Sequence, residues 1–200
     1  ILDCPEGATL VVGHNAKDKE ECAKMIHEGR WSEFIREVPI RKGDFVSIVP
    51  GTVHAIKAGV MLLETQQNSD ITYRVYDYDR LSNGRKRELH IEKSIDVINA
   101  PASPAQDSIH NFANVRKNKP VLMEKSAYYK VWKLVVEDGS ELQLSREKDF
   151  DSSYLLASVV AGSGYINDSA IKKGDHFIVT NECDSLSFSG DMEIILSAQI

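Results

Sequence analysis

Apolar and polar residues recur at two different spacings along the chain, and the change of spacing separates helix from strand. Residues 9–12 form a short β-rich run. From residue 17 to residue 27 the apolar positions follow the spacing of an amphipathic helix, and Asn15 is placed to cap it. A second short helical pattern follows. We therefore expect a short helical insertion over about residues 16–36.

The rest of the chain consists of short apolar runs separated by glycine and proline. In the first half these runs predict strands at residues 53–57, 60–66 and 71–76, and similar runs resume after residue 120. Short strands punctuated by turn residues are typical of an all-β sandwich or barrel. The predicted fold class is therefore all-β, with the helical insertion near the start.

A stretch rich in Pro, Ala, Ser and Asn, residues 100–120, has no hydrophobic period. Such a segment is typical of an interdomain connection, so we expect a linker here between domains at residues 1–99 and 121–200. A weak internal repeat supports two units. Residues 39–49 and 170–180 both read as an apolar position, two basic residues, a Gly-Asp turn and an apolar strand. We expect two copies of one β fold.

The two copies diverge directly after the repeat. The first continues into Pro50-Gly51-Thr52-Val53-His54, whereas the second continues into Asn181-Glu182-Cys183-Asp184, without the proline turn or the histidine. The first copy can therefore hold chemistry that the second has lost, and the second domain is expected to be degenerate.

Composition narrows the classes of partner. The chain has 200 residues, 24 Lys and Arg and 30 Asp and Glu, giving a net charge of −6. An acidic balance argues against nucleic acid or an anionic membrane as the main partner, and the apolar runs are far shorter than the roughly 20 residues of a membrane helix. The three cysteines form no C-x-x-C pair. We expect free thiols and a cytoplasmic protein.

The run from Gly43 through Pro50-Gly51 to His54 resembles the second half of the cupin signature. A Pro-Gly turn reverses the chain tightly, so the strand that follows would present the His54 imidazole into a barrel, where it is well placed to bind a metal. The alternative is a half-buried histidine with a structural hydrogen bond in a β core. From the spacing alone both interpretations stay open.

Polar residues downstream strengthen the case for a site. Glu64 follows His54 by ten residues, lies among apolar residues and falls on a predicted strand, and Arg74 follows Glu64 by ten more. Buried acids are rare unless they are paired or functional. Asp70 stands between the two in a polar run. The alternative is a Glu64–Arg74 ion pair without a catalytic task.

These segments together resemble type I mannose-6-phosphate isomerase, and more closely its short bacterial form. The resemblance rests on the run Pro50-Gly51-Thr52-Val53-His54-Ala55-Ile56 and on Leu63-Glu64 followed by Gln67-Asn68-Ser69-Asp70, Thr72-Tyr73-Arg74 and Tyr76-Asp77-Tyr78-Asp79-Arg80. It is densest between residues 43 and 80. It implies a zinc-dependent aldose–ketose isomerase on two cupin-like jelly rolls, interconverting mannose 6-phosphate and fructose 6-phosphate.

The resemblance also implies roles for individual residues. His54 matches the family's zinc-binding histidine of the Pro-Gly-x-x-His run, Glu64 matches an acid of the active site, and Arg74 matches the catalytic arginine. Asp70 matches the aspartate four residues before that arginine. Arg80 falls where larger members carry a lysine, so the resemblance assigns it less securely.

One departure concerns the metal. The family's other zinc ligands lie in a Gln-x-His-Pro motif and a Gly-Lys-Thr-Glu-like motif, and neither occurs in this chain. Catalytic zinc usually has three protein ligands. Because the chain opens on Ile1-Leu2 as if within a strand, we expect a C-terminal portion of a longer polypeptide, with the other ligands upstream of Ile1. His14 stands before a helix cap and is expected to be a structural residue of a loop, and the other histidines are expected to be surface or structural residues: His27, His90, His110 and His176.

Two other functions compete with the isomerase. One is a non-catalytic two-cupin protein that binds a sugar phosphate, and the presence of Glu64, Asp70 and Arg74 together favours the enzyme over it. A cupin dioxygenase fits less well, because such enzymes need more histidines near the Pro-Gly turn than His54. The expected partner is a small-molecule sugar phosphate.

Overall fold

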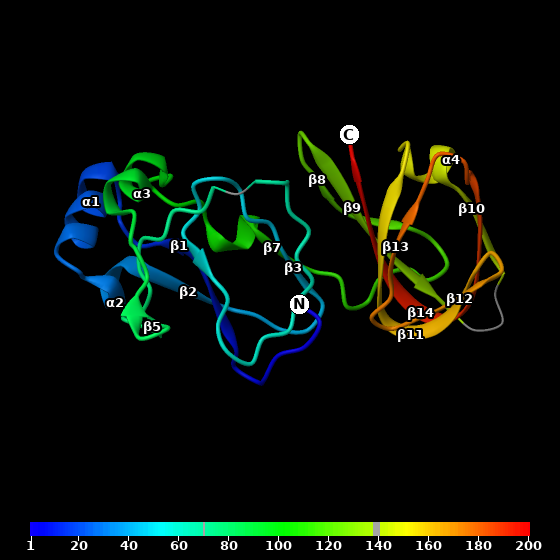
Figure 1. Cartoon of the computed structure of the whole chain (residues 1–200), viewed down its shortest axis with the longest axis horizontal. Helices are drawn as coiled ribbons and strands as arrows, with labels where there is room; N and C mark the ends of the chain where they lie inside the picture. The colour runs from blue at the N-terminus through cyan, green and yellow to red at the C-terminus, as the bar shows by residue number, and fades with distance from the viewer. Residues whose placement is uncertain (70, 138–140) are drawn as a thin grey trace. The chain divides into compact units, whose positions relative to one another are not determined.

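The computed structural model describes residues 1–69, 71–137 and 141–200. The chain is mostly β with a few helices and divides into two compact units, Ile1–His110 and Asn111–Ile200 (Figure 1). The boundary follows the short 3-10 helix η1 (Ala105–Asp107) and lies inside strand β7 (Ile109–Asn111).

The sheet of the first unit is built on β1 (Thr9–His14), whose apolar run supplies an almost wholly buried strand. It pairs antiparallel with β2 (Ile35–Pro39) on one side and with β4 (His54–Ala55) on the other, with Val12 opposite His54. The apolar residues of this sheet form a small core. The register of β1 therefore decides where His54 lies.

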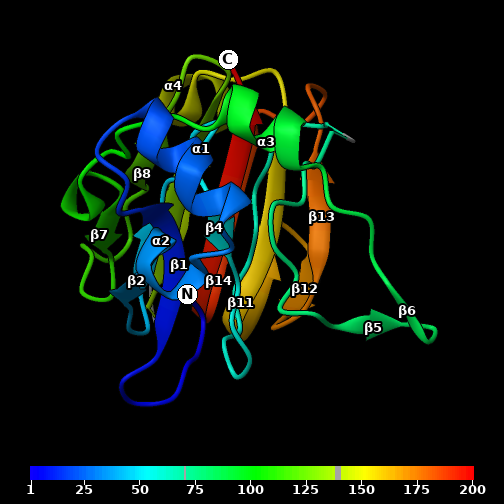
Figure 2. The ribbon, with the colours of Figure 1, turned by 90° about the vertical axis from the view of Figure 1, so that its left-hand side faces the viewer.

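Three helices cover the other part of this unit: α1 (Lys19–His27), α2 (Trp31–Phe34) and α3 (Ile91–Val97). α1 and α3 lie side by side (Figure 2) and share one buried cluster. The helical insertion is shorter than the expected residues 16–36. The cap of α1 is Asp18, which accepts a hydrogen bond from Glu21 N at 2.8 Å, and not Asn15.

The prediction of strands at residues 60–66 and 71–76 is wrong. Among the described residues between 60 and 86, an isolated bridge joins Met61 to Asp3. A short hairpin of two-residue strands, β5 (Leu81–Ser82) and β6 (Arg85–Lys86), projects from the unit (Figure 2). Met61 is 54% exposed and Ile71 is 68% exposed. Their apolar pattern is that of a strand, but a strand forms only where a neighbouring strand satisfies its backbone groups.

The second unit is a seven-stranded antiparallel sheet. Its strands run in the order β12-β11-β14-β9-β8, while β10 pairs with β14 and β13 pairs with β11. The elements are β8 (Val121–Lys125), β9 (Tyr129–Val136), β10 (Leu142–Ser145), α4 (Arg146–Phe150), β11 (Leu155–Ile166), β12 (Ser169–Lys172), β13 (His176–Val179) and β14 (Ser185–Gln199).

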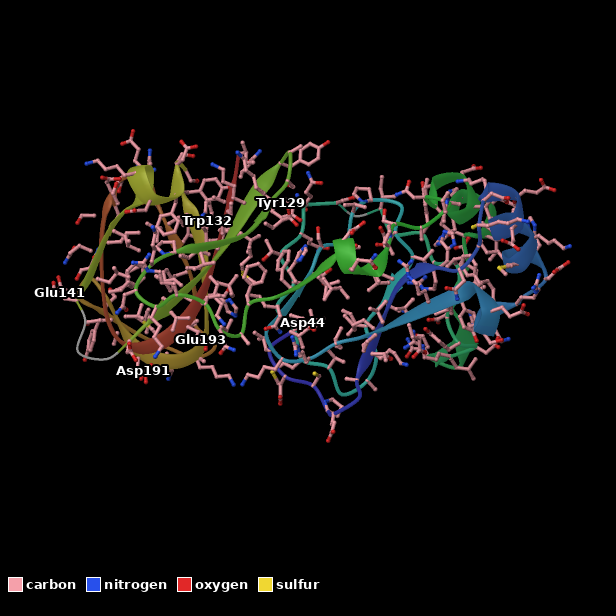
Figure 3. All side chains as sticks on the ribbon, turned by 180° about the vertical axis from the view of Figure 1, so that it is seen from behind. Asp44, Tyr129, Trp132, Glu141, Asp191 and Glu193 are labelled. Carbon is pink, nitrogen blue, oxygen red and sulfur yellow. The ribbon has the colours of Figure 1, made fainter. Side chains whose placement is uncertain are left out.

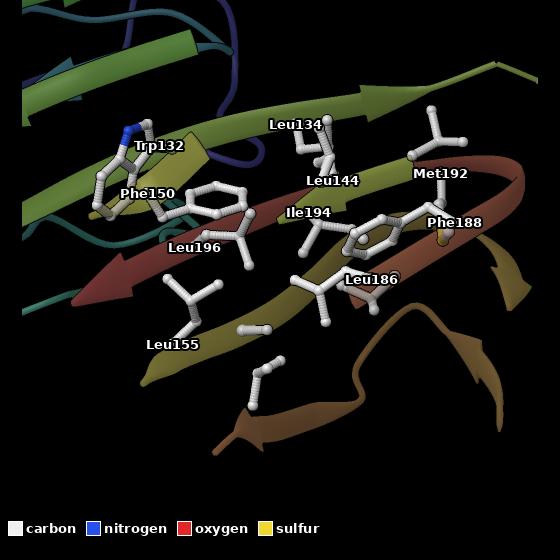
Figure 4. Packing of buried hydrophobic residues seen from close by; sticks show 14 of the residues in the cluster. Trp132, Leu134, Leu144, Phe150, Leu155, Leu186, Phe188, Met192, Ile194 and Leu196 are labelled. Atoms are coloured by element: carbon white, nitrogen blue, oxygen red, sulfur yellow. The ribbon is translucent and has the colours of Figure 1, made fainter. Parts of the chain in front are cut away.

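Large apolar side chains from these strands fill the interior of the second unit (Figure 4). Trp132 packs edge-on against Phe150 at 5.3 Å between ring centroids, and Leu134, Phe188 and Ile194 are fully buried. Acidic side chains such as Glu141 and Asp191 extend outward (Figure 3). Apolar side chains therefore occupy the inward positions of the described strands.

The repeat seen in the sequence forms the same local turn twice. β3 (Asp44–Val46) begins with Asp44, whose carboxylate accepts from Arg41 N at 2.8 Å while its own N–H donates to Arg41 O at 3.1 Å. In the second unit Asp175 accepts from Lys172 N at 2.8 Å and donates to Lys172 O at 3.0 Å. The aspartate of the Gly-Asp pair closes the turn in both places.

Candidate functional site

His54 opens β4, four residues after the Pro50 turn, and its imidazole is exposed. Nδ1 lies 2.9 Å from Thr52 O. A carbonyl oxygen can only accept, so Nδ1 carries a proton, and in the neutral ring Nε2 keeps its lone pair. A neutral imidazole whose other nitrogen donates to a backbone carbonyl is the form that binds metals. The exposure of the ring argues against the alternative of a half-buried structural histidine.

His14 has the opposite arrangement. It ends β1, is 3% exposed, and stacks on Phe34 at 5.0 Å. Nε2 donates to Asn99 O at 2.9 Å, and Nδ1 accepts from Ala16 N at 3.2 Å, so both ring nitrogens have protein partners. Burial lowers the pKa of His14 and keeps the ring neutral. It is a structural residue, as expected, although it ends a buried strand and is not in a loop.

The described residues do not by themselves make a zinc site. In the described ranges no three His, Cys, Asp or Glu side chains gather into a group that could hold a metal ion. His54 has the tautomer of a ligand, but one ligand is fewer than the three that catalytic zinc usually has. The described residues therefore supply one candidate ligand of a zinc centre and not the full set.

Two of the three expected catalytic side chains, Glu64 and Arg74, lie apart from any regular strand. Glu64 is exposed, so the expectation of a buried acid on a strand is wrong. Arg74 is half-buried; its Nη1 donates to Glu88 O at 3.2 Å, and its backbone N–H donates to His90 Nδ1 at 3.1 Å. Within the described residues no hydrogen bond or ion pair joins Glu64 to Arg74, so the simple ion-pair alternative is not observed. Asp70 lies outside the described residues.

A carboxylate that sequence reasoning passed over organises the segment after Arg74. Asp77 is 5% exposed and accepts from Arg80 Nη2 at 2.8 Å and from Arg87 Nε at 2.7 Å, with a second contact to Arg87 Nη2. These hydrogen bonds, first from Arg87 and then from Arg80, lower the pKa of Asp77 to about 2. The sequence signal for this ion pair is the Ser-Asn-Gly turn at residues 82–84, which lies between Asp77 and Arg87.

An aromatic column joins the same segment to α2. Trp31 stacks on Tyr76 with ring centroids 4.5 Å apart, Tyr76 contacts Tyr78 at 4.6 Å, and the guanidinium of Arg80 lies 5.5 Å from the centre of the Tyr78 ring. These contacts and the Asp77 ion pairs hold residues 76–87, whose described strand pairing is confined to the β5–β6 hairpin, against α2. Arg74 lies next to this anchored segment.

This chain resembles known proteins over nearly its whole length. It is 41% identical over 206 aligned residues to the mannose-6-phosphate isomerase of Streptococcus mutans, covering 98% of this chain and 61% of that protein. It is 39% identical to mannose-6-phosphate isomerase ManA of Bacillus subtilis, over 98% of this chain and 62% of the relative. This chain is a homologue of the mannose-6-phosphate isomerases.

The homology extends to three-dimensional structure. The crystal structure of the mannose 6-phosphate isomerase from Bacillus subtilis matches with a TM-score of 0.78 and 34% identity, covering 98% of this chain and 62% of that one. The family model for the mannose-6-phosphate isomerase cupin domain matches residues 122–199, which identifies the second unit as a cupin domain. The chain thus spans about 62% of the length of these relatives.

The mannose-6-phosphate isomerase homology covers 98% of the chain, whereas the family model matches residues 122–199 alone. The model matches the second unit, whose interior is packed with apolar side chains. The candidate residues His54, Glu64 and Arg74 lie in the first unit. Among the described helices none is long and apolar enough to cross a membrane.

Proposed function

We propose that this chain is part of an enzyme that interconverts mannose 6-phosphate and fructose 6-phosphate. The observation that carries the proposal is 41% identity over 98% of the chain to a protein named mannose-6-phosphate isomerase. Because the chain spans 61% of that relative, the activity is proposed for the whole protein. On this proposal the partner of the first unit is a small sugar phosphate.

Glu64 is the proposed proton carrier. Aldose–ketose isomerisation removes a proton from carbon 2 of the aldose and returns a proton to carbon 1, through a cis-enediol. A carboxylate performs both transfers, first as base and then as acid. The exposure of Glu64 supports this role, because an acid paired inside the fold would not reach a substrate.

Arg74 is the proposed anion-binding residue. Its guanidinium has five N–H donors, and the hydrogen bond from Nη1 to Glu88 O anchors one edge of the group. A guanidinium held in this way is suited to an enediolate oxygen or to the phosphate. We keep Asp70, four residues earlier, as a third candidate for the same catalytic group.

His54 is the proposed metal ligand. The Nδ1–H tautomer set by Thr52 O leaves Nε2 to bind zinc. The described residues do not complete a metal site. We therefore propose that the other ligands lie in a part of the full-length protein that corresponds to the remaining length of the relatives. We also propose that both domains, residues 1–99 and 121–200, are cupin-like jelly rolls, of which the first is catalytic.

The test is a coupled turnover assay on the full-length protein. We expect conversion of mannose 6-phosphate, with Glu64→Gln slower by about 10²–10⁴-fold because the proton carrier is lost. Arg74→Ala should be slower by about 10²–10³-fold, with partial recovery in Arg74→Lys. Arg85→Ala is the matched control, because Arg85 is an exposed arginine on β6, and it should stay near wild type.

Two results would overturn the proposal. Sugar-phosphate binding without turnover would favour the non-catalytic binding protein. Turnover that survives unchanged in both Glu64→Gln and Arg74→Ala would remove these residues from the catalytic group.

A further inference from the structure

The loop that presents His54 has little secondary structure of its own. Residues 47–53 form no strand, and within the loop Thr52 N donates to Val49 O at 3.2 Å to close the Pro-Gly turn. β4 itself is two residues long. The position of His54 therefore depends on what the turn rests against.

Asn99, two residues after α3, holds the turn at two consecutive residues. Its side-chain Nδ2 donates to Pro50 O at 2.7 Å, and its backbone N–H donates to Gly51 O at 3.0 Å. The fit is close: a Cβ on Gly51 would lie 2.5 Å from Val97 O and 2.7 Å from Asn99 Nδ2. The turn is docked directly against the C-terminal end of α3.

His14 fixes Asn99 from the other side. Its Nε2 donates to Asn99 O at 2.9 Å, while Nδ1 accepts from Ala16 N. The neighbouring Gly13 N donates to Val53 O at 2.7 Å, directly before His54. The end of β1 and the end of α3 therefore hold the loop on both sides of the Pro-Gly turn.

We propose that Asn99 and His14 are positioning residues that hold the Pro50–Gly51 turn and thereby fix where the His54 imidazole is presented. The functional meaning of this arrangement rests on the proposed role of His54. The arrangement acts through the hydrogen bond from His54 Nδ1 to Thr52 O, since Thr52 directly follows the held turn. A loosened turn would free His54 to exchange between its two neutral tautomers.

The test uses the tautomer of His54, read from its ring nitrogen resonances by NMR of the 200-residue chain. In wild type we expect one form, with the proton on Nδ1. Asn99→Ala removes the donor to Pro50 O at an exposed position, so the fold should persist while His54 becomes a mixture of tautomers. Asn15→Ala is the matched control: its amide also donates to backbone carbonyls, Glu33 O and Ile35 O, but does not touch the turn.

A pair of substitutions at His14 separates its two hydrogen bonds. The amide nitrogen of Gln takes the place of Nε2, and the amide oxygen of Asn takes the place of Nδ1. His14→Gln keeps a donor for Asn99 O and should preserve the His54 tautomer, whereas His14→Asn keeps the acceptor for Ala16 N and should give the mixture. The His176 ring, which contacts Ser158 Oγ at 2.8 Å in the second unit, serves as an internal reference that should not change.

The proposal is overturned if Asn99→Ala and His14→Asn lower the melting temperature but leave His54 in the wild-type tautomer, since the contacts would then serve stability alone. It is also overturned if His14→Gln and His14→Asn shift His54 equally. This readout is independent of turnover. If His54→Ala keeps full activity, the proposed function of His54 fails while the positioning arrangement still stands.

Discussion

Two histidines of the first unit carry opposite tautomers, and a single backbone carbonyl sets each of them. Thr52 O places the proton of His54 on Nδ1, whereas Asn99 O places the proton of His14 on Nε2. The remaining nitrogen of His54 has its lone pair at an exposed ring, while that of His14 accepts from Ala16 N inside the fold. Residue type alone does not separate a candidate ligand from a structural histidine, but the hydrogen-bond partners do.

The Asp77 carboxylate gives a prediction at the same scale. With its pKa lowered to about 2 by Arg87 and Arg80, Asp77 stays ionised in the folded protein below the usual carboxyl pKa of about 3.9. The stability it contributes is fully present above about 3.9 and is lost as the pH falls toward about 2. We expect its carboxyl carbon to titrate near 2 by NMR, and the stability difference between wild type and Asp77→Asn to shrink over that window.

The arginines provide the controls for Asp77. Arg87→Gln removes the largest cause of the shift and should raise the titration midpoint, whereas Arg85→Gln, two residues away, should leave it in place. A midpoint that is the same in Arg87→Gln as in wild type would contradict the assigned cause.

At the scale of elements, the Pro-Gly turn is a docked element whose neighbour is the end of α3. Gly51 has φ +82°, and a side chain there meets Val97 O and Asn99 Nδ2. Gly84, at the tip of the β5–β6 hairpin, has φ +74° and no atom within 4 Å of an added Cβ. The two glycines share a backbone conformation and differ in their surroundings.

Substituting alanine at both glycines separates these effects. Gly84→Ala should lower the free energy of unfolding by roughly 1–2 kcal/mol, the cost of placing a residue with a Cβ in the left-handed backbone conformation. Gly51→Ala should lower the free energy of unfolding further, because the clash of the added Cβ with the end of α3 adds to the same backbone cost. Chemical denaturation of both variants measures the difference, and equal losses would show that the turn is not held against the helix.

Some elements of the fold can be predicted from the sequence and others cannot. The helix before residue 28 and the Gly-Asp turns of the repeat follow from local signals, because a cap and an Asp side chain act on backbone groups within four residues. The strands expected at 60–66 and 71–76 do not form, because strand formation needs a distant partner that an apolar pattern does not reveal. The same limit hides Asn99, whose contacts with Pro50 and His14 span 49 and 85 residues.

Across the whole chain, two units carry different parts of the evidence. The second unit matches the cupin family model and is packed with apolar side chains, whereas the first holds His54, Glu64 and Arg74, the motif residues that resemble the isomerases. His54 follows the Pro-Gly turn, and the roles proposed for it and for Glu64, Asp70 and Arg74 rest on the motif resemblance. The net charge of −6 gave no sign of the local arginine-rich segment after residue 73.

The proposed role of His54 is tested by measuring zinc content and mannose 6-phosphate turnover together in the full-length protein, in wild type and in His54→Ala. His110→Ala is the matched control, because His110 is another exposed histidine of the first unit. We expect His54→Ala to lose zinc and at least about 100-fold in turnover, more than the loss caused by removing a residue that only orients a metal ligand, while His110→Ala should match wild type. Equal zinc and equal turnover in wild type and His54→Ala would contradict it.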